Sequence, residues 1–245
     1  MTLPSDATPQ TEPPRVIIMC GGKGKRLRPY TTVLPKPLMP IGDRSILELV
    51  LRKLAAAGFR HVTLCVGYLA EIMQAVIGDG SKFGLQVDYA LEEKPLGTIG
   101  PLAFLENLGT DFLVMNGDVL TDLNPMDVVT LHRQTKAELT IATYERTHQI
   151  DFGVLQCDTG TEEVHAFIEK PTRSYRVSMG IYCLNKSLLP LIPKGEYFGF
   201  DQLVLRLLAE RRRVQSCLHQ GYWLDIGRLE DYEAAQTDPR WSVES

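Results

Sequence analysis

The chain has 245 residues, which is enough for one large α/β domain or two small ones. Its net charge of −4 argues against a general binder of nucleic acids or of anionic membranes, because such proteins usually carry an excess of basic residues. No apolar run reaches the roughly 18 residues that a membrane-spanning helix requires. We therefore expect a cytoplasmic protein with no nucleic-acid or membrane partner.

The two ends of the chain differ in composition from its middle. Residues 1–14 are rich in proline and threonine and contain no apolar core, which predicts a disordered leader and not a signal or transit peptide. Residues 237–245 form a short tail. Between them we expect one folded unit, 15–236, with two halves that meet near residue 125. The five cysteines are scattered and form no Cys-x-x-Cys pair, so buried free thiols in a reducing compartment are expected.

In the first half of the chain, short apolar strands alternate with helices. After a strand that starts at Val16, a helix over 46–57 opens with the capping-box residues Ser45 and Glu48 and stops at Gly58. Further strands are expected over 61–66, 85–91 and 112–115, and further helices over 70–77 and 101–108. This alternation predicts an α/β fold with a doubly wound, mainly parallel sheet that binds ligands at the carboxyl ends of its strands.

The second half contains more strands and fewer helices. Strands are expected over 139–144, 153–157, 165–168 and 177–184. We interpret them as an extension of the sheet and an antiparallel subregion over the pocket. A helix over 202–209, a strand over 214–218 and a helix over 229–235 complete the chain.

The loop after the first strand combines glycines with a concentration of positive charge. It holds four cationic side chains within six residues, namely Lys23, Lys25, Arg26 and Arg28. Glycines let backbone N–H groups approach a phosphate closely. The loop is not a Walker motif, since no Ser or Thr follows a Gly-Lys pair. It is not the dinucleotide fingerprint of dehydrogenases either, because Leu27 stands where the third glycine belongs.

Two carboxylates and one charged pair are further candidates for chemistry. Asp118 directly follows a buried strand, where a carboxylate can hold Mg²⁺ or cap the next element. Asp225 lies in Trp223-Leu224-Asp225, beside an aromatic residue in what could be a simple turn. The pair Glu169-Lys170 precedes a proline and by itself would indicate a surface turn.

These patterns together resemble the sugar-1-phosphate nucleotidylyltransferase family. The family signature Gly-Gly-x-Gly-x-Arg-Leu-x-Pro-x-Thr, followed by Lys-Pro, corresponds to residues 21–31 and 36–37. The resemblance covers roughly residues 16 to 235, with five motifs in the family's order. It implies a Rossmann-like, glycosyltransferase-A-like domain. No hexapeptide repeat follows, so the left-handed β-helix of larger relatives is not expected.

The resemblance implies the transfer of a nucleoside monophosphate from a nucleoside triphosphate to a sugar 1-phosphate, with release of pyrophosphate. The implied catalytic residues are Arg26, Lys36, Asp118 and Asp225, of which the two aspartates would hold Mg²⁺. The implied nucleotide contacts are Gly21, Gly22, Gly24, Lys25, Arg26, Gly80, Gly97, Thr98 and Gly117. The implied sugar-phosphate contacts are Gly153, Glu169, Lys170 and Gly180. Residues 15–125 would therefore form the nucleotide-binding half and residues 126–236 the sugar-binding half.

The choice of base and of sugar substrate rests on weaker sequence signals than the reaction class does. Thymidylyl relatives carry a glutamine where this chain has Ala75, and Gln74 would point elsewhere because one helical residue turns by about 100°. The loop 97–101 is similar to that of guanylyl and some uridylyl relatives. We therefore expect GTP with mannose 1-phosphate or a manno-heptose 1-phosphate, as in the short guanylyltransferases of the family.

Other functions stay open at this point. One is a uridylyl-, thymidylyl- or other nucleotidylyltransferase that acts on a different sugar or cyclitol 1-phosphate. Another, of a different class, is a non-catalytic regulatory subunit that binds a nucleotide-sugar. Such a subunit would be expected to have lost Arg26, Lys36 or one of the two aspartates. The sequence does not exclude a homodimer.

Overall fold

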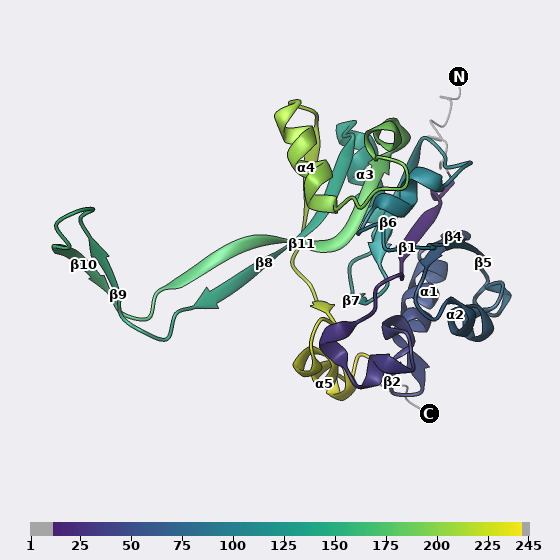
Figure 1. Cartoon of the computed structure of the whole chain (residues 1–245), viewed down its shortest axis with the longest axis horizontal. Coiled ribbons are helices and arrows are strands. Elements are labelled where there is room, and N and C mark those ends of the chain that lie inside the picture. The colour runs from purple at the N-terminus through teal and green to yellow at the C-terminus, as the bar shows by residue number, and fades with distance from the viewer. Residues whose placement is uncertain (1–11, 242–245) are drawn as a thin grey trace, which may run out of the picture.

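The fold is built on a seven-stranded sheet at the centre of the computed structural model, which describes residues 12–241 (Figure 1). The strand order is β12-β8-β11-β6-β1-β4-β5. The strands are β1 (Val16–Met19), β4 (His61–Val66), β5 (Gln86–Leu91), β6 (Asp111–Asn116), β8 (Leu139–Gln149), β11 (Thr172–Asn185) and β12 (Val214–His219). Of these seven, β11 alone runs against its neighbours. The expected mixed, mainly parallel sheet is confirmed.

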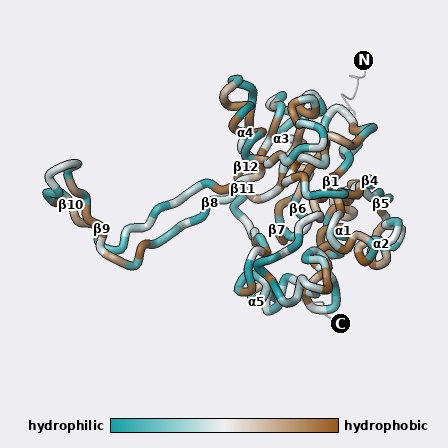
Figure 2. Tube along the Cα trace, viewed as in Figure 1, coloured by the Kyte–Doolittle hydropathy of each residue, from teal (hydrophilic) through white to brown (hydrophobic). Residues whose placement is uncertain are grey.

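Helices cover both faces of the sheet, as a doubly wound fold requires. They are α1 (Ile46–Ala56), α2 (Ala70–Ile77), α3 (Pro125–Thr135) and α4 (Phe200–Ala209). A fifth helix, α5 (Leu229–Thr237), packs in a separate cluster with Leu27 and Ile41. Alternate residues of β1 point to opposite faces. Ile18 packs in the cluster that holds α1, α2 and α3, whereas Ile17 packs with α4. The central strands accordingly appear as the most hydrophobic part of the chain (Figure 2).

Most of the expected elements are present, and α1 shows why. The Ser45 hydroxyl accepts a hydrogen bond from the Glu48 amide, and the Glu48 carboxylate accepts one from the Ser45 amide, so the capping box is confirmed. The expected helix over 101–108 is wrong. Only a 3-10 turn forms over Gly100–Phe104, because Leu105 is extended and Asn107 has a left-handed φ of 56°.

Three elements that position the site were not expected from the sequence. Helix α3 opens with Asn124, whose side chain accepts a hydrogen bond from the Met126 amide, and with a proline in its first turn. Two short strands, β7 (Val119–Thr121) and β13 (Trp223–Asp225), form an antiparallel pair. Each is only three residues long, which leaves no clear periodicity to detect.

The strands β8 and β11 continue beyond the sheet as a long two-stranded arm, which ends in the hairpin of β9 (Val154–Cys157) and β10 (Val164–Ile168) (Figure 1). The sequence suggested an antiparallel subregion over the pocket. The arm instead projects away from the body, because β8 and β11 stay paired as far as Gln149 and Thr172.

The structure describes the two chain ends only in part. Most of the expected leader and tail, residues 1–11 and 242–245, lies outside the described residues, and α5 extends to Thr237, one residue into the expected tail.

Three of the cysteines are buried free thiols, as expected, whereas Cys157 is exposed on the arm. Among residues 12–241, no helix is long and apolar enough to span a membrane.

Replacing Phe112 by alanine is expected to lower the free energy of unfolding by about 3–5 kcal/mol, because its ring is fully buried in the sheet. Phe104→Ala is the matched control, since that ring is 52% exposed, and it should cost about 1 kcal/mol or less. Urea denaturation measures both values. Similar losses in the two variants would contradict the position of Phe112 in the core.

Candidate active site

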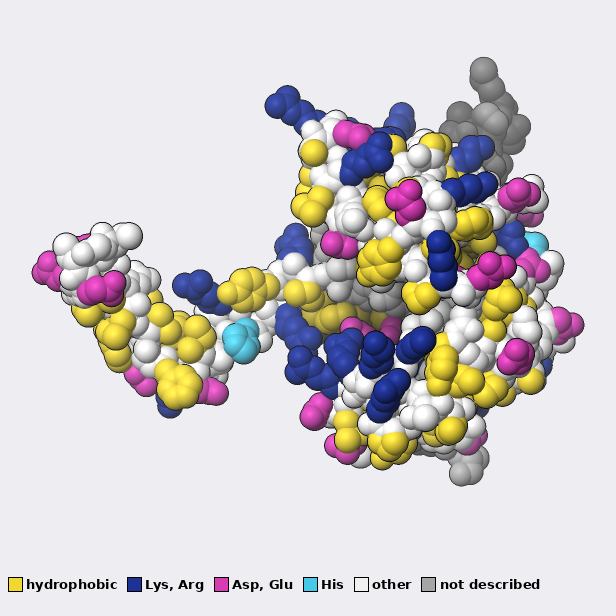
Figure 3. Space-filling view, viewed as in Figure 1, with side chains coloured by type: hydrophobic (Ala, Val, Ile, Leu, Met, Phe, Trp, Pro, Cys, Tyr) yellow, Lys and Arg dark blue, Asp and Glu magenta, His cyan; other side chains and the backbone are white. Residues whose placement is uncertain are grey.

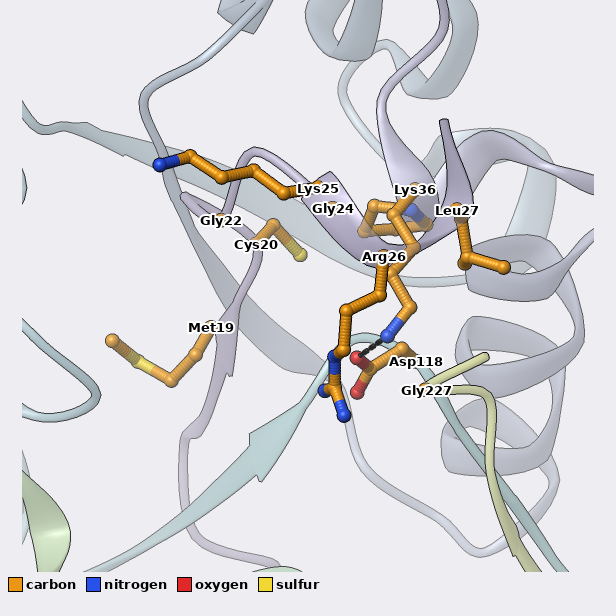
Figure 4. A pocket seen from close by; sticks show the side chains of 11 residues that line it. Met19, Cys20, Gly22, Gly24, Lys25, Arg26, Leu27, Lys36, Asp118 and Gly227 are labelled. Atoms are coloured by element: carbon orange, nitrogen blue, oxygen red, sulfur yellow. Dashed lines mark hydrogen bonds and ion pairs between the residues drawn. The ribbon is translucent and has the colours of Figure 1, made fainter. Parts of the chain in front are cut away.

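The candidate site lies at the carboxyl ends of β1 and β6, which are neighbouring parallel strands. A cavity of about 280 Å³ opens there (Figure 4). Its lining includes Cys20, Gly22, Gly24, Lys25, Arg26, Lys36, Asp118 and Gly227. The structure therefore brings the first-strand loop, the Lys-Pro segment, Asp118 and the C-terminal segment to one place.

The glycine-rich loop packs closely against Thr31 on one side. Gly24 has a φ of 56°, and a β-carbon there would lie 2.9 Å from the Thr31 methyl group. The Thr31 hydroxyl donates to the Gly24 carbonyl at 2.9 Å, and Leu27 is buried in a satellite core. Gly22 has open space around its α-carbon. The loop is therefore anchored on one side and accessible on the other.

Lys36 and Asp118 form an ion pair at the floor of the cavity. The Lys36 amine donates to Asp118 Oδ2 (Figure 4). The other oxygen, Asp118 Oδ1, is buried and has no hydrogen-bond partner among the described residues. The Arg26 guanidinium lies beside Gly227, where a β-carbon would come within 3.4 Å of its nitrogen. The absence of a side chain at Gly227 leaves room for this arginine.

Asp225 reaches the same site through the pairing of β13 with β7. This pairing sets Asp225 opposite Val119, and the Ile226 amide donates to the Asp118 carbonyl at 3.1 Å. Burial raises the pKa of Asp225, and the negative charge of Asp118 raises it further, whereas Lys36 and Arg26 act in the opposite direction. Two carboxylates more than 100 positions apart in the sequence therefore share one electrostatic environment.

These two carboxylates fit a divalent cation. Asp118 Oδ1 lacks a partner, and the charged form of Asp225 is disfavoured by burial and by Asp118. A bound cation would give Asp118 Oδ1 a partner and would favour the charged form of Asp225. Oxygen ligands are those that Mg²⁺ prefers, and it usually retains waters and substrate phosphates as its other ligands. Residues 12–241 contain no cluster of three or more His, Cys, Asp or Glu side chains suited to a metal.

Cys20 also lines the cavity but is a poor nucleophile. Burial raises the pKa of its thiol well above the ordinary value, and the charges of nearby acidic groups raise it further. The thiol is therefore neutral at physiological pH. The site contains no arrangement for covalent catalysis by this residue.

A second cavity of about 760 Å³ lies between the base of the arm and the segment from β13 to α5. Its lining includes Arg26, Tyr144, Glu145, Arg146, Thr147, His148, Trp223, Asp225, Arg228 and Asp231. Trp223 is fixed there, since its indole nitrogen donates to the Met179 carbonyl at 3.0 Å. Lys and Arg side chains gather around this hollow of the surface (Figure 3). The lining itself combines three arginines with three carboxylates, Glu145, Asp225 and Asp231.

A third cavity, of about 310 Å³, lies on the other side of the glycine-rich loop. Its lining includes Gly21, Gly22, Glu92, Leu96, Gly97, Thr98, Asn116, Asp118 and Tyr197. Gly97 has a φ of 84°, and a β-carbon there would lie 2.5 Å from the Phe198 carbonyl oxygen. The Thr98 hydroxyl accepts a hydrogen bond from the Phe200 amide at 2.7 Å. These contacts hold the loop against the segment before α4.

Glu92 is a candidate residue that the sequence analysis missed. It directly follows β5, just as Asp118 follows β6, and this position was the available signal. Burial raises the pKa of its carboxyl group. The Leu96 amide donates a hydrogen bond to this carboxylate at 3.4 Å, which acts in the opposite direction but leaves the pKa raised. A β-carbon on Gly21 would lie only 2.4 Å from Glu92 Oε1. Gly21 therefore makes room for this carboxylate at the edge of the third cavity.

Six of the predicted contacts line none of these three cavities, and four of the six lie away from them. Gly80 lies in the turn after α2, where a β-carbon would meet Val87 at 2.5 Å, so its glycine has a packing reason. Gly153, Glu169 and Lys170 lie on the arm, away from the body (Figure 1). There, a β-carbon on Gly153 would lie 3.2 Å from Glu169 Oε2.

Two other predicted glycines lie close to the site but pack against protein atoms. A β-carbon on Gly117 would lie 2.7 Å from Cys20 Sγ, so this glycine allows β1 and β6 to approach. Gly180, with a φ of 76°, lies in the irregular stretch of β11 at the base of the arm, against the Asn116 side chain.

Known proteins resemble this chain over most of its length. The family model described as nucleotidyl transferase matches residues 15–240. The mannose-1-phosphate guanyltransferase of Yarrowia lipolytica is 34% identical over 223 residues, 88% of this chain and 61% of that protein. The mannose-1-phosphate guanylyltransferase of Mycobacterium tuberculosis is 34% identical over 230 residues, 91% of this chain and 63% of that protein. The chain thus spans about three fifths of the length of these curated relatives.

A solved structure shares the fold. HddC from Yersinia pseudotuberculosis superimposes with a TM-score of 0.71 at 25% identity. The match covers 91% of this chain and 98% of HddC.

Proposed function

Because the chain belongs to the nucleotidyl transferase family, we propose that it transfers a nucleoside monophosphate from a nucleoside triphosphate to a sugar 1-phosphate. The products are a nucleotide-sugar and pyrophosphate. The observation that carries this proposal is the unpartnered Asp118 Oδ1, which lies beside Asp225 and two cations in a cavity under a glycine-rich loop. The names of the curated relatives and the resemblance of the motifs support the substrate class.

The triphosphate binds over the glycine-rich loop in this proposal. The open side of Gly22 exposes backbone N–H groups, and Lys25 and Arg26 add two positive charges at the rim. Arg26 holds the two terminal phosphates and stabilises the charge that develops on pyrophosphate as it leaves. Lys36 holds the phosphate of the incoming sugar. The nucleophile is a phosphate oxygen that is already anionic, so the reaction requires no general base.

Asp118 and Asp225 would hold Mg²⁺, and the metal when bound would neutralise negative charge on the phosphate oxygens. Lys36 has a second effect, since its pairing with Asp118 Oδ2 holds that carboxylate in place and leaves Oδ1 without a protein partner. The contribution of these residues is then positioning and electrostatic stabilisation in a prearranged site.

Glu92 favours guanine as the base. Guanine presents two adjacent donors, N1–H and the exocyclic amine, which one carboxylate can accept together, as in other bidentate pairs. Uracil and thymine present one N–H between two carbonyl oxygens, and these oxygens would be repelled by a carboxylate. Since Glu92 lines the third cavity beside Gly97 and Thr98, this cavity is the proposed base site. GTP with a manno-configured sugar 1-phosphate is the proposed substrate pair.

The test is pyrophosphate release in the presence of Mg²⁺, with five nucleoside triphosphates assayed against a panel of sugar 1-phosphates. We expect GTP with mannose 1-phosphate or a manno-heptose 1-phosphate to give the highest rate. Activity with UTP or TTP instead would overturn the base assignment. Nucleotide binding without turnover on any sugar would contradict the catalytic proposal and favour a regulatory subunit.

A further inference from the structure

The hairpin at the end of the arm presents an apolar face that nothing in the described structure covers. Strands β9 and β10 pair with each other in a separate two-stranded sheet. Their register sets Leu155 opposite Phe167 and Cys157 opposite Val164, so all four side chains share one face. Phe167 is 62% exposed and Leu155 57%. An isolated hairpin is marginally stable in water, and an exposed apolar face of this kind marks a contact surface.

The pairing of the arm keeps its tip away from the site on its own body. Glu145 lines the second cavity, and the ladder continues from there to Gln149, after which the Ile150 amide donates to the Pro171 carbonyl at 3.0 Å. The last residue of β8 that lines the cavity is His148, which pairs with Arg173. At about 3.3 Å per residue, Lys170 lies roughly 10 Å beyond this pair. The end of a paired ribbon cannot return to its own base while the pairing lasts. Glu169 and Lys170 accordingly are not among the residues that line the cavity of their own body.

The charge of the tip is opposite to that of the cleft. Residues 151–170 contain one lysine and five carboxylates, Asp151, Asp158, Glu162, Glu163 and Glu169. The cleft between the glycine-rich loop and the base of the arm is lined by five cations, Lys25, Arg26, Lys36, Arg146 and Arg228, and by four carboxylates, Asp118, Glu145, Asp225 and Asp231. Figure 3 shows the acidic tip and the dark blue cluster at the cleft on the same molecule. A tip of this kind is complementary to the cleft of another copy.

Exposed apolar side chains also lie on the segments that flank this cleft in the chain. Tyr30, which follows the glycine-rich loop, is 53% exposed, and Leu229, next to the cleft residue Arg228, is 38% exposed. They offer an apolar surface for the face formed by Leu155 and Phe167. Both the charge and the hydrophobicity of the tip therefore have counterparts near the cleft.

We propose that two copies of this chain exchange their arms across a twofold axis, so that each tip covers the cleft of the other copy. The exchange delivers Glu169 and Lys170 to the sugar-phosphate side of the partner's site, which is incomplete without them. Such a contact is isologous and closes as a dimer. The inference rests on the proposed function, because it assigns these two residues to the sugar phosphate.

Complementation between two inactive variants tests the exchange. Lys36→Ala disables the body and Lys170→Ala disables the arm, and each variant alone is expected to lose most of its activity. The two are co-expressed with different affinity tags, and the mixed dimer is isolated. Exchange predicts about half the wild-type turnover per dimer, because one of the two sites combines an intact body with an intact arm.

Two results of this experiment would overturn the exchange. A mixed dimer as inactive as its parents would show that each arm serves its own body, and an active Lys170→Ala homodimer would remove the role of the arm. Wild-type enzyme is assayed in parallel. Its inactivity would be a failure of the proposed function, and the following measurement, which needs no activity, would still test whether the tips hold two copies together.

Light scattering on the full chain gives that independent result. We expect twice the mass of one chain for wild type. The double substitution Leu155→Ser and Phe167→Ser should give monomers. Leu205→Ser with Leu208→Ser is the matched control, since these leucines are equally exposed on α4, and it should remain dimeric. A wild-type monomer, or a dimer that is indifferent to the changes in the tip, would overturn the proposal.

Discussion

Asp118→Asn is expected to lower kcat for nucleotidyl transfer by about 10²–10³-fold. Asparagine has nearly the same shape but no charge, so Lys36 loses its ion-pair partner and the buried Oδ1 position no longer supports a cation. The measurement is the initial rate of pyrophosphate release at saturating GTP, Mg²⁺ and sugar 1-phosphate.

The control for this substitution is Asp43→Asn, whose side chain is 65% exposed on the body and lines none of the three cavities. It should keep the wild-type rate. Circular dichroism and thermal melting would establish that both variants are folded. A folded Asp118→Asn enzyme within twofold of wild type would remove this residue from the metal site.

Glu92→Gln is expected to lower kcat/KM for GTP by roughly 10- to 100-fold, the size of one good bidentate contact to a base. The carboxylate accepts from both donors of guanine, whereas a glutamine amide offers one acceptor and turns a donor toward the other. The same change should preserve or improve the use of UTP, because an amide can pair with an N–H and a neighbouring carbonyl together. Steady-state kinetics with both nucleotides measure this ratio.

Glu93→Gln is the matched control, since its side chain is exposed on the same loop and lines neither the first nor the third cavity. It should leave the ratio of GTP to UTP unchanged. If Glu92→Gln kept the wild-type preference for GTP, the third cavity would not be the base site, and guanine selection would have to come from other groups.

The sequence by itself determined the features that depend on neighbouring residues. The capping box of α1, the alternation of strands and helices and the glycine-rich loop are all short-range patterns, and each recurs in the structure at or near its expected place. The motif around Arg26 and Lys36 also indicated phosphate chemistry, because the residue types and their spacing carry that information without the fold.

The tertiary structure decided where distant segments meet. The pairing of β7 with β13 places Asp225 beside Asp118, and the loop after β5 turns Glu92 toward Gly21. The direction of the arm likewise depends on how long β8 and β11 stay paired. Strand register is set by cross-strand contacts between segments far apart in the sequence, and a short strand has no local pattern that identifies its partner. That is why Arg26, Lys36, Asp118 and Asp225 could be named from the sequence while their arrangement could not.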